Sequence, residues 1–192
     1  MLLRGKVLRP YWRLRFHSFG VGSVFHKPVW LSGAHKIAVG DHAVVMQCWI
    51  AAERPAWGRP GPALVLGDRV TMRPFSTITA AESIVLEDDV AVGSHSYISD
   101  LEHLRAGKEA WADSRSAAER AVENPNVVSP IETTPVRIGR GTWIGERVAV
   151  LRGSNVGAHC VIGTNSVVRG TIPDYSIAVG APARVVGSTL EA

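Results

Sequence analysis

The sequence is poor in cysteine, with only Cys48 and Cys160 among its 192 residues. So few thiols exclude a disulfide-rich secreted scaffold. Both cysteines also fall at positions of a repeat where side chains pack. We therefore expect two buried free thiols rather than a disulfide or a metal site.

Long apolar segments are absent as well. No apolar run is long enough to span a bilayer as a helix, and the first residues lack the apolar stretch of a signal peptide. The length of 192 residues suits a single domain with a core of its own. We therefore expect a one-domain, cytoplasmic protein.

Acidic residues are missing from residues 1–36, which combine basic and aromatic side chains instead. One interpretation is an N-terminal arm over residues 1–36 whose aromatic rings cap the open end of a solenoid, while its basic groups stay in solvent. A second is contact between the basic arm and an anionic membrane surface. We favour the cap, and we do not expect nucleic acid as a partner, because no binding module of known pattern is present.

What the sequence does contain is a six-residue period. The evenly spaced aliphatic residues are Ile138, Ile144, Val150, Val156, Ile162 and Val168, and several of them are followed by Gly. A lone helix needs a period of 3.6 and a half-buried strand a period of 2, so neither explains this spacing. A solenoid of short strands does, because each turn stacks its apolar residues on the turn below.

Small or β-branched residues recur four places after each aliphatic one, at Thr142, Val148, Ser154, Cys160 and Ser166. A triangular coil of three hexapeptides explains both sites, with the aliphatic side chain in the interior and the small one near a corner. We expect the repeat Gly to supply a turn conformation that a residue with Cβ resists.

The same phase can be followed upstream through Val39, Leu66, Ile78 and Val92. The sequence thus predicts an all-β solenoid domain over residues 37–187 and a short tail over 188–192. Two segments break the phase, at residues 51–62 and 101–135. The longer one is expected to form an inserted loop with one or two helical turns within 107–123, and loops of this length are commonly functional.

The C-terminal half carries a family resemblance. Its segments Pro135–Gly145, Val161–Val168 and Val179–Val186 resemble hexapeptide-repeat O-acetyltransferases, most closely those that acetylate galactosides, maltose and capsule or colanic-acid sugars. The resemblance covers about residues 37–187 of the chain. It implies a left-handed parallel β-helix, a homotrimer with sites between neighbouring subunits, and acetyl-CoA as the donor. It also implies a saccharide or glycoconjugate acceptor. We expect no metal cofactor.

The catalytic hypothesis rests on His103, which lies where the repeat breaks into the long insertion. In the resembled family a histidine at this exit is the general base. A sugar hydroxyl is a weak nucleophile that must lose its proton as it attacks a thioester, and neutral imidazole can accept that proton. Many relatives have a second histidine two places earlier, where this chain has Leu101.

Other candidates follow from the same resemblance. The positions that match the family's coenzyme contacts are Trp143, Gly145, Thr164, Arg169 and Arg184. The acceptor-binding candidates are Arg73, His95 and Asp100. Arg73 stands where sugar-acetylating relatives often have Asn, which leads to the hypothesis of an anionic or unusual acceptor. The remaining histidines are expected to be structural or exposed.

Several alternatives stay open. An amino-sugar N-acyltransferase would keep the fold and the donor, and a non-catalytic solenoid scaffold would need neither acetyl-CoA nor His103. A γ-class carbonic anhydrase is disfavoured because the chain lacks a paired His-x4-His for zinc. A serine acetyltransferase usually adds a helical N-terminal domain, which this chain does not show.

Overall fold

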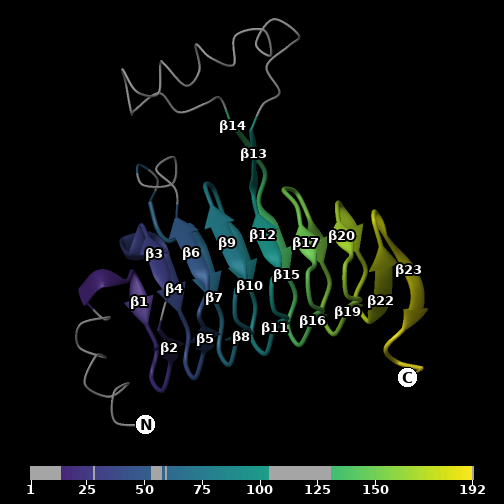
Figure 1. Ribbon diagram of the computed structural model, residues 1–192, viewed down its shortest axis with the longest axis horizontal. Coiled ribbons are helices and arrows are strands. Elements are labelled where there is room, and N and C mark those ends of the chain that lie inside the picture. Colours follow the sequence, from purple (N-terminus) through teal and green to yellow (C-terminus); the bar gives the residue numbers. More distant parts are fainter. Residues whose placement is uncertain (1–13, 28, 53–57, 59, 104–130, 192) are drawn as a thin grey trace, which may run out of the picture.

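The structure, a computed structural model, describes residues 14–27, 29–52, 58, 60–103 and 131–191. Over these residues the chain winds through three sheets in turn, with one short strand in each sheet per coil (Figure 1). Neighbouring strands in a sheet belong to successive coils and run parallel. This arrangement is the left-handed parallel β-helix that the sequence predicts.

The first sheet comprises β1 (Ser18–Phe19), β4 (Ile37–Val39), β7 (Leu64–Leu66), β10 (Ile84–Leu86), β15 (Val136–Ile138), β18 (Asn155–Val156) and β21 (Thr171–Ile172). The second comprises β2 (Val24–His26), β5 (Val44–Met46), β8 (Thr71–Met72), β11 (Ala91–Val92), β16 (Trp143–Ile144), β19 (Val161–Ile162), β22 (Ser176–Gly180) and β23 (Ala183–Ser188). The third comprises β3 (Trp30–Ser32), β6 (Trp49–Ala52), β9 (Thr77–Ala80), β12 (Tyr97–Ser99), β17 (Ala149–Val150) and β20 (Val167–Val168). A 3-10 turn, η1 (Ala34–Lys36), precedes β4.

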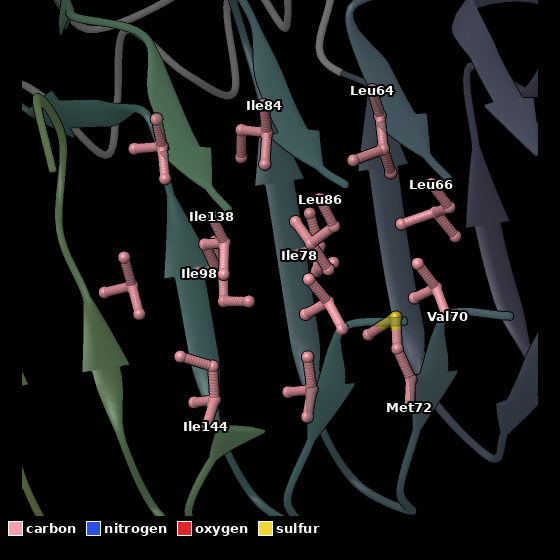
Figure 2. Packing of buried hydrophobic residues seen from close by; sticks show 14 of the residues in the cluster. Leu64, Leu66, Val70, Met72, Ile78, Ile84, Leu86, Ile98, Ile138 and Ile144 are labelled. Atoms are coloured by element: carbon pink, nitrogen blue, oxygen red, sulfur yellow. The ribbon is translucent and has the colours of Figure 1, made fainter. Parts of the chain in front are cut away.

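The core is a set of aliphatic ladders inside the triangle, as Figure 2 shows for its central coils. Along the first sheet Leu66, Leu86 and Ile138 stand in register and are almost fully buried. Ile144 in the second sheet and Ile98 in the third sheet occupy the equivalent interior positions and are also almost fully buried. Burying an aliphatic side chain of this size stabilises a fold by about 1.5–3 kcal/mol, so this stack of ladders is the main stabilising feature.

The small residues beside the corners are buried, as predicted, and they bond coil to coil. The hydroxyl of Thr142 donates to the carbonyl of Gly157 at 2.8 Å and accepts the N–H of Cys160 at 3.1 Å. The hydroxyl of Ser96 donates in the same way to Gly145 at 3.0 Å. Each hydroxyl satisfies backbone groups that would otherwise be buried without a partner.

The role predicted for the repeat glycines is wrong. Gly139 does not have a positive φ; the left-handed conformation falls two residues later in the turn, on Gly141 at a φ of 66° and, in the next coil, on His159 at a φ of 55°. A Cβ on Gly139 would lie 2.5 Å from the backbone of Gly157. Glycine is thus needed there for the close approach of successive coils.

The coil begins earlier than residue 37. Strands β1, β2 and β3 pair with β4, β5 and β6, so a complete coil lies within the segment assigned to a capping arm. The rings of Phe16, Phe19 and Phe25 pack edge to face at centroid distances of 5.2–5.5 Å and are nearly buried. At the other end β23 turns back antiparallel on β22.

The three corners of the triangle differ. We call the turns from the first to the second sheet and from the second to the third sheet the tight corners, and the turns from the third sheet back to the first the insertion corner. Both interruptions of the repeat, 51–62 and 101–135, fall between a strand of the third sheet and the next strand of the first sheet, which is the insertion corner. The helical turns expected within 107–123 lie outside the described residues. No helix within the described ranges is long and apolar enough to cross a membrane.

Candidate active site

The long insertion leaves the solenoid through a short antiparallel hairpin. Its strands are β13 (Leu101–His103) and β14 (Ile131–Thr133), and we call these six residues the hairpin root. His103 ends β13 and is paired with Ile131 through the backbone. The structure does not describe the side chain of His103. The backbone nevertheless places the residue just outside the insertion corner, next to the coil that ends with β12.

Asp100 connects β12 to the hairpin root and has no exposed surface. Its carboxylate accepts the N–H groups of Ala81, Glu82 and Ser83 at 2.7, 2.8 and 2.7 Å. Burial raises the pKa of the Asp100 carboxyl, and the three N–H donors act against that rise. This arrangement gives Asp100 a structural task at the insertion corner, and it does not suit the acceptor contact expected from the sequence.

Arg73 and His95 lie elsewhere, at the tight corner between the second and third sheets. Both are exposed. The ring of His95 packs on Phe75 with centroids 5.1 Å apart, and both turn residues have a positive φ. These two acceptor candidates are therefore close to each other, while Asp100 belongs to a different corner.

Most of the coenzyme candidates line the same tight corner farther along the solenoid. Trp143 projects from β16 with 57% of its surface exposed, and Thr164 is exposed in the turn after β19. Arg184 on β23 pairs in register with Val179 of β22, and Val179 packs against Gly163. Trp143, Thr164 and Arg184 thus belong to the second sheet or to the turn that follows it, and their role as coenzyme contacts stays a prediction.

Two coenzyme candidates differ from this group. Gly145 is buried, and a Cβ there would lie 2.7 Å from the carbonyl oxygen of Ile162, so its glycine is explained by coil stacking. Arg169 lies at the insertion corner, where its guanidinium is 3.7 Å from the carboxylate of Glu102. Arg169 is therefore on the corner of His103 and apart from Trp143 and Thr164.

Arg152 is not among the residues predicted from the sequence, and the structure places it against the hairpin root. Its guanidinium bonds Glu102 at 2.7 Å and Glu132 at 2.9 Å. The spacing hides this contact, because Arg152 is 50 residues from Glu102. The only available signal was the pair of glutamates flanking the insertion.

The two cysteines are free and buried, as expected. Burial raises the pKa of both thiols, which favours the neutral thiol over the nucleophilic thiolate. Among the described residues no group of three or more His, Cys, Asp or Glu side chains is arranged to hold a metal ion.

Comparisons with known proteins agree with the repeat. Residues 135–170 match the family model described as bacterial transferase hexapeptide, six repeats. A protein of Mycobacterium tuberculosis named as an acetyltransferase, Rv3034c, is 40% identical over 65% of this chain and 37% of its own length. A protein of Escherichia coli named for O-acetyl transfer in lipopolysaccharide biosynthesis, WbbJ, is 32% identical over 68% of this chain and 62% of its own length. The chain thus matches less than two thirds of the length of either relative.

The fold also matches a solved structure. A variant of AntD, an N-acyltransferase from Bacillus cereus in complex with dTDP and coenzyme A, superposes with a TM-score of 0.74. The match covers 94% of this chain and 88% of AntD at 17% sequence identity. At that identity the likeness establishes the shared fold alone.

Proposed function

This chain is a hexapeptide-repeat protein of the bacterial transferase type, and on that premise we propose that it transfers an acetyl group from acetyl-CoA to a hydroxyl of a saccharide or glycoconjugate. The observation that carries the proposal is the position of His103 at the end of β13, where the solenoid opens into its long insertion. The sequence relatives named as acetyltransferases support the reaction class.

In the proposed reaction a neutral His103 accepts the proton of the acceptor hydroxyl as its oxygen attacks the thioester carbonyl carbon. The carbon–sulfur bond then breaks, and the coenzyme thiolate leaves and takes up a proton. No acyl-enzyme is required, and burial of Cys48 and Cys160 gives neither thiol the exposure that a nucleophile needs. The acetyl group ends as an ester on the acceptor.

A second copy of the chain completes the proposed site. Within one copy the third sheet separates His103 at the insertion corner from Trp143 and Thr164 at the tight corner. The outer face of that sheet exposes Trp30, Trp49 and Tyr97 by 40–53%. A neighbouring copy that covers this face would bring its own tight corner toward His103, which supports a homotrimer with sites between subunits. Light scattering with size-exclusion chromatography will give the number of copies.

Transfer to an amino group is the second candidate, because AntD is an N-acyltransferase of the same fold. We prefer the hydroxyl because WbbJ, which is named for O-acetyl transfer, is similar in sequence as well. A panel that contains both amino sugars and ordinary glycosides will separate the two candidates.

The deciding experiment measures release of free coenzyme thiol from acetyl-CoA over that panel. We expect acceptor-dependent release by the native chain and a decrease of about 10²- to 10⁴-fold for His103→Ala, the range typical of losing a general base. His159→Ala is the control, because this exposed histidine stacks on Tyr175 at the other tight corner. If His103→Ala keeps the native rate, His103 is not the base. If no acceptor stimulates release and acetyl-CoA does not bind, the chain is a scaffold.

A further inference from the structure

The hairpin root is bonded on the side of the following coils by Arg152, and Glu102 of the root also lies 3.7 Å from the guanidinium of Arg169. Arg152 lies in the insertion corner after β17, and its side chain is 25% exposed. Its Nε bonds the carboxylate of Glu102 on β13 at 2.7 Å, and its Nη2 bonds that of Glu132 on β14 at 2.9 Å. Its Nη1 lies 3.3 Å from the hydroxyl of Thr134. One guanidinium therefore spans both strands of the root.

The negative charges of the two glutamates lie close together, and the cationic guanidinium of Arg152 offsets their repulsion. Glu102 and Glu132 are paired directly across the hairpin, where like charges destabilise neighbouring strands. The planar guanidinium presents several donors in a fixed fork, so it can satisfy both carboxylates at once. The hydrogen bond and the charge of Glu102 also raise the pKa of Arg152.

The preceding coil holds the root from the other side. The hydroxyl of Thr133 donates to the carboxylate of Glu82 at 2.6 Å. Glu82 is itself one of the three residues whose N–H groups bond Asp100. The N–H of Thr134 donates to the carbonyl of Asp100 at 2.9 Å. The root is thus fixed at its base by the backbone and at its side by Arg152.

We propose that Arg152 is a positioning residue that, by bridging Glu102 and Glu132, holds the β13 backbone so that His103 meets the acceptor in a productive place. This inference rests on the proposed function, because it assigns Arg152 an effect that passes through His103. His103 directly follows Glu102, so a shift of Glu102 moves it as well. A displacement of about 1 Å in a catalytic group can cost about 10²-fold in rate.

The test compares Arg152→Gln with Arg152→Lys by steady-state kinetics. We expect Arg152→Gln to lower kcat by about tenfold to a hundredfold with little change in KM for acetyl-CoA. Lysine keeps the charge but cannot span both carboxylates, so Arg152→Lys should fall between the native chain and Arg152→Gln. The matched control is Arg69→Gln, because Arg69 makes a two-point bond to Asp89 across coils at a tight corner. This control should keep native kinetics.

A double mutant tests whether the effect of Arg152 on the rate depends on His103. If Arg152 acts through His103, then Arg152→Gln adds no further loss in the His103→Ala background. An equal fold loss in both backgrounds would mean that Arg152 acts independently of His103, and native kinetics in Arg152→Gln would likewise overturn the proposal.

Hydrogen exchange separates this inference from the proposed function. Amides of Leu101–His103 and Ile131–Thr133 should exchange faster in Arg152→Gln, while those of the sheets keep native protection. Unchanged exchange at the root rejects the bridge as a positioning device, whatever the kinetics. Faster exchange in a protein whose native form transfers no acetyl group rejects the proposed function, and the role of Arg152 in it.

Discussion

The insertion corner and the tight corners are built from the same repeat, yet they use it differently. At the tight corners nearly every turn is short, and successive coils touch through backbone, as Gly139 and Gly157 do. At the insertion corner a Cβ on Gly153 would meet only the side chain of Thr134, at 3.3 Å, and a Cβ on Gly170, in the last coil to reach this corner, would meet nothing within 4 Å. Both insertions depart from the solenoid at the insertion corner, and His103 lies there as well. The comparison indicates that backbone contact between coils holds the tight corners, while the insertion corner is held by side chains such as Asp100 and leaves room for the insertions.

Asp100 is expected to give the largest effect. Asp100→Ala leaves one buried and two partly buried backbone N–H groups without this carboxylate, each at a cost of about 1–3 kcal/mol, so the free energy of unfolding should fall by about 3 kcal/mol or more. Asp88→Ala is the matched variant at a tight corner, because the more exposed Asp88 accepts one N–H, from Asp68 at 3.0 Å.

Water can replace the bond of Asp88, so Asp88→Ala should cost no more than the roughly 0.5–1.5 kcal/mol typical of one hydrogen bond. Urea unfolding of both variants measures the difference. Equal losses would show that Asp100 has no special part in closing the insertion corner.

Glycine substitutions test the difference in space directly. Gly139→Ala places a methyl group 2.5 Å from the backbone of Gly157 and should cost about 1–3 kcal/mol through overpacking. Gly170→Ala meets no neighbour, and only its φ of 87° opposes the change, at about 1–2 kcal/mol.

Thermal and urea unfolding should therefore show a larger loss in the free energy of unfolding for Gly139→Ala than for Gly170→Ala. A crystal structure of Gly139→Ala should show coils separated at β15 and β18. If Gly170→Ala proves worse, backbone conformation rather than space distinguishes the corners.

Much of this comparison could be predicted from the sequence. The six-residue period identified the coil, the buried ladder from Ile138 to Val168 and the place of the insertion, because apolar stacking imposes the same spacing on every coil. The aliphatic pattern does not reveal the start, because the first coil places Phe19 and Phe25 at the same spacing. Among the described residues this first coil pairs with a neighbour on one side only, and the three rings of Phe16, Phe19 and Phe25 pack together there.

The rest depended on contacts that no local pattern records. The repeat glycines could be explained by a turn conformation or by close approach, since both exclude a Cβ, and only the structure distinguishes them. Asp100 looked like a site residue beside His103, but its partners lie at residues 81–83 on another coil. The bridge of Arg152 likewise joins residues far apart in sequence, across a hairpin that the six-residue period does not predict.

The two aromatic–histidine stacks should give the smallest effect and sharpen the comparison between the tight corners. Phe75 packs on His95 and Tyr175 on His159, and both aromatic residues are substantially exposed. Replacing either by Ala should lower the free energy of unfolding by about 0.5–1.5 kcal/mol. Only the corner of Phe75 carries acceptor candidates, Arg73 and His95. Phe75→Ala should therefore raise KM for the acceptor while Tyr175→Ala leaves it unchanged, and an equal KM in both variants would remove this corner from the acceptor site.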